Sequence, residues 1–355
     1  PKTLKVARKA YQEDRLTQEE LTLIEDEAIR DLVKKQKEIG LKAITDGEFR
    51  RSWWHLDFMW GLNGVEKVDV DNGYKFEHEE TRAESARLTG KISGEGHPFV
   101  EHFKFIQQFA DEEVIARQML PAPAQFFAEL QRPENIEATQ KVYPDTEALI
   151  ADIASAYQTV ISELYEAGCR SVQLDDCTWG MLVDEGYWDW ASKNTNETVE
   201  SLSRLYVSLN NAAIEGHPED LAITTHVCRG NYHSTWASSG AYDTVAEILF
   251  GDEKVDAYYL EFDTERSGGF ESLVNVSDDK LVVLGLFSSK VGTLEDKEEI
   301  KARIEEASKY VPLERLCVSP QCGFASTEEG NILTEEEQWN KLRLVREVAA
   351  EVWGK

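Results

Sequence analysis

Short apolar segments of strand type alternate with amphipathic segments of helical period along most of the 355-residue chain. The strand-type segments begin near residues 42, 115, 171, 221, 257, 281 and 315. Around them, helices are expected over residues 4–40, 100–112, 145–167, 197–215, 243–250, 269–274, 297–310 and 334–352. Parallel strands need helical crossovers of this kind, so the alternation predicts an α/β fold with a parallel sheet and helices outside it.

The strand count selects among α/β architectures. A (β/α)8 TIM barrel needs eight parallel strands and the sequence indicates seven, so we predict a barrel whose remaining strand lies ahead of Pro1. No Gly-x-Gly-x-x-Gly segment opens a helix after a strand, which disfavours a dinucleotide-binding sheet. Residues 1–355 are expected to form one domain. The aromatic-rich residues 51–67 are interpreted as a long functional loop, and residues 64–95 as an inserted hairpin.

The charge balance excludes several kinds of partner. The chain carries 67 acidic residues against 38 Lys and Arg, a formal charge of −29, which repels phosphate backbones and anionic membrane surfaces. We therefore expect small-molecule partners and no nucleic-acid or membrane role, with the oligomeric state left open. No long apolar run indicates a membrane span or a leader, so a cytoplasmic location is expected. Five cysteines are too few for a disulfide framework, and reduced thiols are predicted.

Four side chains that commonly bind metal follow three of the predicted strands. In LAITTHVCRG, His226 and Cys228 are two residues apart and therefore project from one face of the strand. Glu261 ends the next predicted strand, and Cys322 follows the last one. The carboxyl ends of barrel strands meet at one mouth, so these side chains are expected to converge. One imidazole, two thiolates and a carboxylate predict a Zn²⁺ site.

These residues also have interpretations without a metal. A His-x-Cys pair is more often a buried histidine and a packed thiol, Glu261 can pair with Arg266, and Cys322 lies in a turn where any small residue fits. Cys177 is a rival ligand, because it follows two aspartates at another strand end. His233 is close enough in sequence to the His-x-Cys pair to act as a proton carrier. The convergence of four ligands on one predicted mouth favours the metal site.

Three segments occur in a specific order: THVCRGNY, YYLEFDTERSG and VSPQCGF. In this order they resemble the catalytic domain of cobalamin-independent methionine synthase. That family holds zinc with a His-x-Cys motif, a Glu and a final Cys, so the resemblance implies zinc binding by His226, Cys228, Glu261 and Cys322. It runs from about residue 30 to the C-terminus. The chain looks closer still to the short, single-barrel relatives often labelled methionine synthase II.

Two further segments agree with the family. TDGEFRR and VQLDD resemble the segments with which it binds the amino group of its amino-acid substrate. The resemblance implies this role for Glu48 and Asp175. The alternative for both carboxylates is an ion pair with an internal Arg.

Other segments depart from the family. Its general-acid histidine is replaced by LGLFSSK, which puts Lys290 or a serine at that place. Where the family has a tryptophan that stacks on folate, LPAPAQFFAEL offers Phe126 and Phe127. The family's Ile-Gly-Ser segment has no counterpart after Pro1. The methyl donor is therefore left open among folate, corrinoid and methylsulfonium compounds.

The resemblance implies a zinc-dependent methyltransferase, in which a thiol such as homocysteine is deprotonated on the metal, takes a methyl group and becomes methionine. A zinc-dependent hydrolase is one alternative, disfavoured by the two cysteines and by the absence of a His-x-His pair. The other alternative is a non-catalytic binding protein on the same barrel, suggested by the missing general acid and folate platform.

Overall fold

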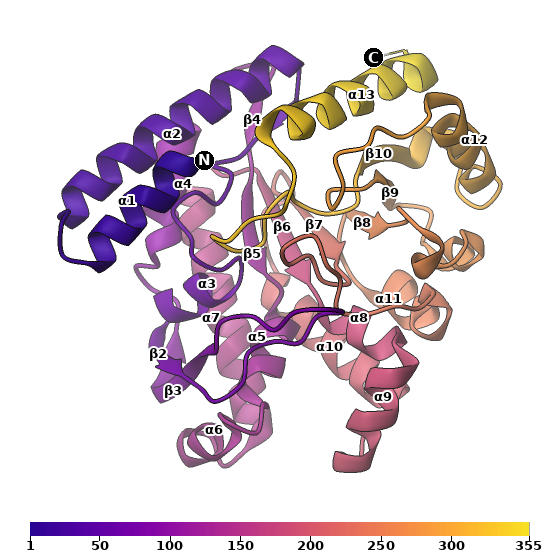
Figure 1. The fold of residues 1–355 in the computed structure, drawn as a ribbon. Helices are drawn as coiled ribbons and strands as arrows, with labels where there is room; N and C mark the ends of the chain where they lie inside the picture. The colour runs from indigo at the N-terminus through magenta and orange to yellow at the C-terminus, as the bar shows by residue number, and fades with distance from the viewer. Residues whose placement is uncertain (355) are drawn as a thin grey trace.

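A computed structural model describes residues 1–354. At its centre is a six-stranded parallel sheet with the strand order β10-β9-β8-β7-β6-β5. The strands are β5 (Gln118–Pro121), β6 (Ser171–Asp176), β7 (Ala222–Val227), β8 (Ala257–Glu261), β9 (Leu281–Phe287) and β10 (Leu316–Pro320). β7 and β9 are buried at every position after the first, as strands covered on both faces are. All six carboxyl ends lie at one edge of the sheet (Figure 1).

A two-stranded parallel pair joins β1 (Ala43–Ile44) to β4 (Ile115–Ala116). Only Arg117 separates β4 from β5, so this pair continues along the chain into the six-stranded sheet. With β4 and β5 counted together, all seven predicted strand positions hold parallel strands, and the predicted α/β fold is confirmed. Within residues 1–354 no strand pairing joins β10 to β1, so closure into a TIM barrel stays a prediction.

Helices surround the sheet (Figure 1). The α-helices expected from the sequence are α1 (Lys2–Gln12), α2 (Gln18–Ile39), α4 (Pro98–Gln107), α7 (Thr146–Glu166), α10 (Val199–Ile214), α11 (Ala246–Asp252), α12 (Lys297–Ala307) and α13 (Glu335–Trp353). α2 begins at a capping box between Thr17 and Glu20 and ends at Gly40 with φ of 88°, within the segment of residues 4–40 that was predicted to be helical. Among the described residues, no helix is both long and apolar enough to cross a membrane.

Several short helices were not predicted. They are α3 (Leu56–Gly61), α5 (Pro123–Leu130), α6 (Ile136–Val142), α8 (Thr178–Val183) and α9 (Glu185–Ala191). Residues 51–67 are thus not one long loop, because they contain α3 and the start of β2. The helix expected over 269–274 is a 3-10 helix at Glu271–Asn275. Helices this short are marginal on their own and depend on packing against the rest of the protein, which local periodicity does not report.

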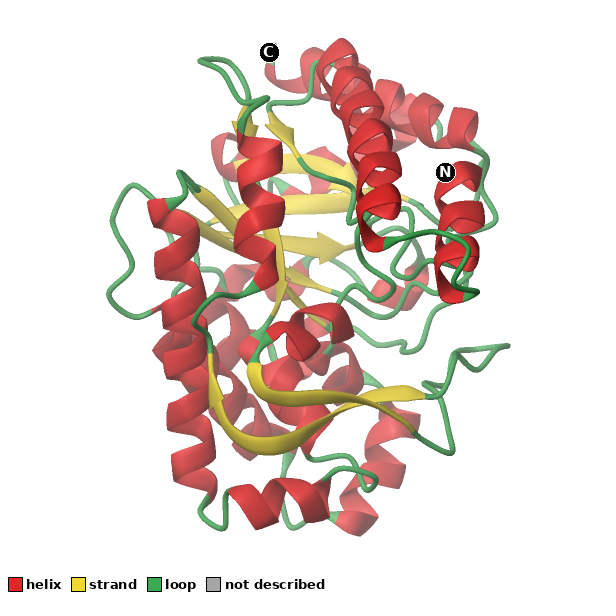
Figure 2. Ribbon diagram, turned by 90° about the vertical axis from the view of Figure 1, so that its left-hand side faces the viewer, coloured by secondary structure: helices red, strands yellow, loops and turns green. Residues whose placement is uncertain are grey.

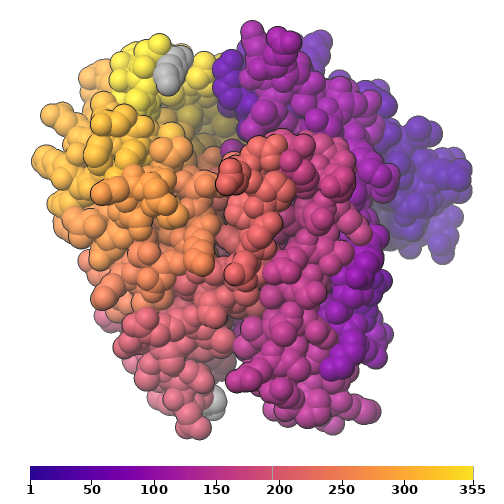
Figure 3. Space-filling view, turned by 180° about the vertical axis from the view of Figure 1, so that it is seen from behind, coloured from indigo at the N-terminus to yellow at the C-terminus, as the bar shows by residue number. Residues whose placement is uncertain are grey.

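An antiparallel pair lies apart from the parallel sheet. β2 (Asn63–Asp69) and β3 (Glu84–Ser93) form it within the segment expected as a hairpin. Figure 2 shows the two strands as a curved ribbon below the parallel strands. Their connection carries Tyr74, whose side chain reaches Glu129 of α5. Seen from behind, the first half of the chain forms one side of the molecule and the second half the other (Figure 3).

A buried polar network lies behind the end of β6. The Asn210 Nδ2 donates to Glu253 Oε1 at 2.9 Å and to Asp176 Oδ2 at 3.3 Å. Its Oδ1 accepts the backbone N–H of Ala124 at 2.9 Å. All three network side chains are buried. Burial, together with the nearby charge of Asp176, raises the pKa of Glu253 to about 8. The network ties the strand that carries Asp175 to α10 and α5.

We expect Glu253→Gln to remove part of the pH dependence of stability. The folded protein holds the Glu253 proton up to about pH 8, whereas the unfolded chain releases it near pH 4.5. The free energy of unfolding therefore falls as the pH rises between these values, by up to about 1.4 kcal/mol per pH unit from this group. Urea unfolding across this range measures the slope, which should be shallower in the variant. Equal slopes in both proteins would contradict this expectation.

Candidate metal centre and substrate cavity

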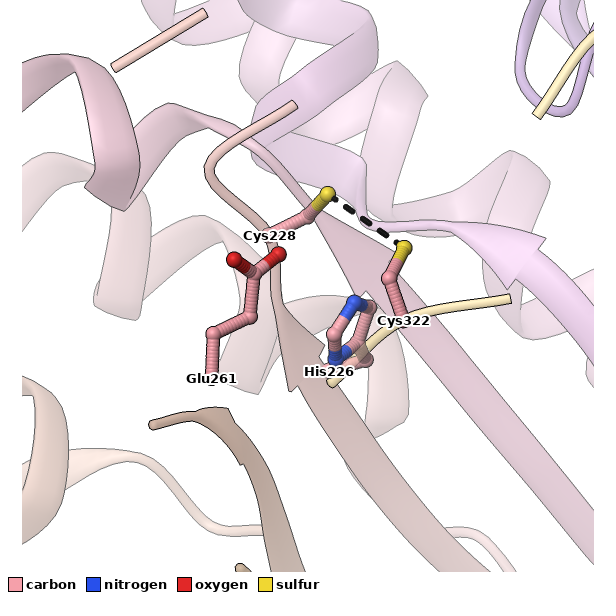
Figure 4. A group of neighbouring side chains, drawn as sticks. All are labelled: His226, Cys228, Glu261 and Cys322. Atoms are coloured by element: carbon pink, nitrogen blue, oxygen red, sulfur yellow. Dashed lines mark hydrogen bonds between the residues drawn. The ribbon is translucent and has the colours of Figure 1, made fainter. Parts of the chain in front are cut away.

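The four predicted ligands converge at the carboxyl edge of the sheet. His226 lies in β7, Cys228 directly after it, Glu261 at the end of β8 and Cys322 just after β10. One ligand atom from each lies within 4.8 Å of all the others. The two Sγ atoms of Cys228 and Cys322 are 3.7 Å apart (Figure 4). Parallel strands in register bring these ends together, so residues up to 96 positions apart in sequence form one cluster that could hold a metal ion.

His226 is oriented by the backbone of the neighbouring strand. Its Nδ1 lies 3.1 Å from the carbonyl oxygen of Tyr259. A carbonyl only accepts hydrogen bonds, so Nδ1 carries the proton and donates it. The other ring nitrogen, Nε2, is buried and has no hydrogen-bond partner. Metal-binding histidines are held in this way, with one nitrogen bonded to the protein and the other facing the metal.

The charge of the cluster also favours a cation. A hydrogen bond from the Cys228 thiol, with His226 close by, holds the pKa of Cys322 well below its ordinary value. Burial lowers the pKa of His226, but the Cys322 thiolate, Asp175 and Glu261 outweigh burial and raise it to about 10. The raised pKa of His226 reflects an excess of negative charge around its ring, which attracts a proton. A divalent cation would neutralise the same excess, and the N, S, S and O donor set suits zinc.

Glu261 is fully buried and held at both oxygens. The backbone N–H of Arg229 donates to Oε1 at 3.1 Å, and Nη2 of Arg266 donates to Oε2 at 3.2 Å. The ion pair with Arg266 that was the alternative to metal binding is therefore formed, but the Glu261 carboxylate still lies within the cluster. Burial raises the pKa of Glu261, but nearby Lys290, Arg266 and His226 lower it below its ordinary value. Glu261 is thus an ionised carboxylate whose orientation is fixed by the hydrogen bonds from Arg229 and Arg266.

Glu48 and Asp175 lie on the wall of the same cavity as Cys228 and Cys322, a space of about 2100 Å³. Glu48 has a φ of 57°. Its carboxylate forms an ion pair with Arg51 at 3.1 Å, which is the alternative to substrate binding that the sequence left open. Burial raises the pKa of Glu48 to about 8, although Arg51 lowers it. Burial likewise raises the pKa of Asp175 to about 6. Two half-buried carboxylates that resist ionisation would gain from a cation between them.

Two of the other predicted site residues lie at or near the cavity. Phe127 lines it, whereas the neighbouring Phe126 is fully buried in the core, because successive helical residues face different sides. Lys290 is buried, its Nζ has no hydrogen-bond partner, and its charge lowers the pKa of Glu261. The structure does not bring His233 into the cluster. Its ring is about half exposed and contacts Glu79 at 3.0 Å.

Sequence reasoning missed a group of aromatic residues at the cavity. Trp54, His55 and Tyr74 all line it. The aromatic richness of residues 51–67 was the available signal for Trp54 and His55, and it indicated a functional segment without indicating which residues face the site; Tyr74 lies outside that segment. The rival ligand Cys177 also lines the cavity, and its hydrogen bond with Cys228 is the largest cause of the raised pKa of Cys228.

The chain matches the family model described as the catalytic domain of cobalamin-independent synthase over residues 1–351. The chain belongs to this family. The uncharacterized protein YxjH of Bacillus subtilis (strain 168) is 43% identical over 352 residues, covering 99% of this chain and 91% of YxjH. A crystal structure from Listeria monocytogenes, provisionally assigned as a vitamin-B12 independent methionine synthase, is 41% identical with a TM-score of 0.79. The match covers 100% of this chain and 95% of the Listeria chain.

A third related structure has lower sequence identity and shows similarity of fold alone. The B12-independent methionine synthase of Shewanella sp. W3-18-1, solved in complex with selenomethionine, is 22% identical with a TM-score of 0.70. The match covers 95% of this chain and 90% of that one. Membership of the cobalamin-independent synthase family confirms the resemblance seen in the sequence and identifies this chain as methionine synthase-like.

Proposed function

We propose that this protein is a zinc-dependent methyltransferase that moves a methyl group to a thiol such as homocysteine, giving methionine. The observation that carries the proposal is the cluster of His226, Cys228, Glu261 and Cys322 with its buried, unpartnered histidine nitrogen. Bound zinc would supply the positive charge that keeps an incoming thiol deprotonated at neutral pH.

The protein's own residues would hold the acceptor. We assign the ammonium group of the amino acid to Glu48 and Asp175, which line the cavity beside Cys322. An ammonium ion placed between them would favour the ionised form of both and form charge-assisted hydrogen bonds. This anchoring would direct the thiol toward the cluster. Phe127 would provide an apolar surface for the methyl donor, with Phe126 supporting it from the core.

Lys290 is the proposed proton donor to the leaving group, in the place of the family's histidine. We expect Lys290→Met to lower kcat by about 100-fold, the size of a lost general acid, with zinc content unchanged. Methionine keeps the length and apolar stem of lysine, so the buried site stays filled. Single-turnover methyl transfer and metal analysis of the same preparation measure both quantities. An unchanged kcat would remove Lys290 from the mechanism and leave His233, about half exposed, as the alternative proton carrier.

The proposal is tested by metal content and by a panel of methyl donors. Purified protein should hold one equivalent of zinc, which His226→Ala combined with Cys228→Ala should abolish. With homocysteine as acceptor, methionine should form from methyltetrahydrofolate, methylcobalamin or S-methylmethionine. Zinc without methyl transfer from any donor, but with ester or amide hydrolysis, would favour the hydrolase. Protein without zinc or activity would favour the non-catalytic binding protein.

A further inference from the structure

A chain of hydrogen bonds links His55 to a buried carboxylate through Tyr74. The His55 Nε2 lies 3.1 Å from the Tyr74 hydroxyl, which donates to Glu129 Oε2 at 2.8 Å. The other carboxylate oxygen, Oε1, accepts from the Ser85 hydroxyl and from Nη1 of Arg132. The chain joins three separate segments: the one before α3, the β2–β3 connection and α5. Nothing in the proposed mechanism accounts for such a network.

The donors around Glu129 fix the direction of the chain. Hydroxyl and guanidinium groups donate to both of its oxygens, which is the pattern of an ionised carboxylate. Tyr74 has one hydroxyl proton and gives it to Glu129, so its oxygen accepts from His55. The proton of the neutral imidazole is therefore on Nε2. The other nitrogen, Nδ1, carries a lone pair and can only accept.

This accepting nitrogen has no partner. His55 is 3% exposed, and its Nδ1 is buried without a hydrogen bond. Nδ1 does not become a donor by protonation at neutral pH, because burial, with a further contribution from Arg132, lowers the pKa of His55 to about 3. A buried acceptor without a donor loses its hydration without compensation, and few such groups remain in folded proteins, so the bare Nδ1 of His55 needs an explanation.

The surroundings of His55 indicate what would satisfy it. His55 lines the large cavity with Trp54, whose ring stacks on the imidazole at 4.5 Å between centroids. The backbone N–H of Trp54 donates to the carbonyl oxygen of Ser326, four residues after the cluster residue Cys322, so this wall is tied to the loop that follows Cys322. The thiol substrate already has Glu48 and Asp175 for its ammonium group. His55 is therefore available to the second substrate.

We propose that His55 Nδ1 accepts a hydrogen bond from an uncharged or cationic N–H or O–H group of the methyl donor, and that Tyr74 and Glu129 fix the imidazole for this purpose. This assignment rests on the proposed methyl transfer. A carboxylate at the same position would face a lone pair and be repelled. His55 thus acts as a binding residue that selects the donor by its hydrogen-bond donor group.

The state of the ring is measured without any activity. In ¹⁵N-detected NMR of wild-type protein, the His55 signals should show the Nε2–H tautomer with an unprotonated Nδ1 at neutral pH. Adding the effective donor from the panel of methyltetrahydrofolate, methylcobalamin and S-methylmethionine should shift the Nδ1 signal. An Nδ1–H tautomer, or an Nδ1 signal that no donor shifts, would overturn the proposal.

Two substitutions separate the two ring nitrogens. His55→Gln can keep the contact to Tyr74 but places no acceptor at Nδ1, whereas His55→Asn places an amide oxygen near Nδ1. We expect His55→Gln to raise the KM for the methyl donor by roughly tenfold, with kcat and zinc content close to wild type, and His55→Asn to recover part of the loss. An unchanged KM in His55→Gln would contradict the assignment. If either variant fails to fold, the wild-type NMR decides.

Failure of this inference differs from failure of the proposed function. If methionine forms but His55 is insensitive to donor, the methyltransferase proposal stands and the role of His55 is rejected. If no donor gives methionine, the function itself is rejected, whatever the tautomer of His55.

Discussion

Cys322→Ser should yield a folded protein without its zinc and without methyl transfer. The substitution leaves three ligands and removes the thiolate that lies 3.7 Å from Cys228. Removing a residue that only hydrogen-bonds to a metal ligand typically lowers metal affinity by about 10–100-fold. Removing a ligand itself should therefore lower zinc affinity by at least about 100-fold. Competition with a zinc chelator measures the affinity, and circular dichroism verifies the fold.

Cys317→Ser is the matched control. Cys317 lies in β10, five residues before Cys322, and is outside the cluster. This variant should keep both its zinc and its activity. Full zinc affinity in Cys322→Ser, or equal losses in both variants, would show that the metal is held elsewhere. If Cys322→Ser retains its zinc, Cys177, the other thiol beside Cys228, would become the candidate ligand.

The double variant Glu48→Gln with Asp175→Asn should lower kcat/KM for homocysteine by about 1000-fold. Each charge-assisted hydrogen bond to the ammonium contributes about 1.5–3 kcal/mol, and both would be lost. Amides keep the shape of the carboxylates, and both groups line the cavity rather than the core. Most of the effect should appear in KM. Steady-state kinetics with homocysteine varied measure it, together with zinc content.

A substrate analogue provides the control for this prediction. 4-Mercaptobutanoate has the thiol and carboxylate of homocysteine but no amino group. Wild type should use it poorly, and the double variant should lose little more with it. An equal loss with both thiols would mean that Glu48 and Asp175 act on the fold or on the metal centre. Their role as ammonium ligands would then be rejected.

The fold was largely predictable because its elements are periodic. Seven apolar strand segments separated by helical segments indicate parallel pairing; six of them lie in the central sheet, and the seventh, β1, pairs in parallel with β4. The start and end of α2 follow from local chemistry, a capping box at Thr17 and a left-handed glycine at Gly40. The short helices such as α5 and α9 were missed, because their stability comes from tertiary contacts rather than from their own sequence. Barrel closure depends on pairing between distant strands, which periodicity does not specify.

The metal cluster was predictable for a related reason. Residues at the carboxyl ends of parallel strands meet at one edge, so His226, Cys228, Glu261 and Cys322 could be grouped before their distances were known. The burial of Phe126 and the outward position of His233 against Glu79 were not predictable, because a side chain's direction in a loop or short helix depends on what packs around it.

The sequence by itself determined the order of the parallel strands and of the longer helices between them, the four candidate ligands at the strand ends and the family resemblance, because all of these depend on local pattern and spacing. Tertiary structure alone decided which nitrogen of His226 is free, which charges surround Glu261, and that Tyr74 and Glu129 reach His55 from distant segments. Those properties depend on distances between atoms far apart in sequence, and packing sets these distances.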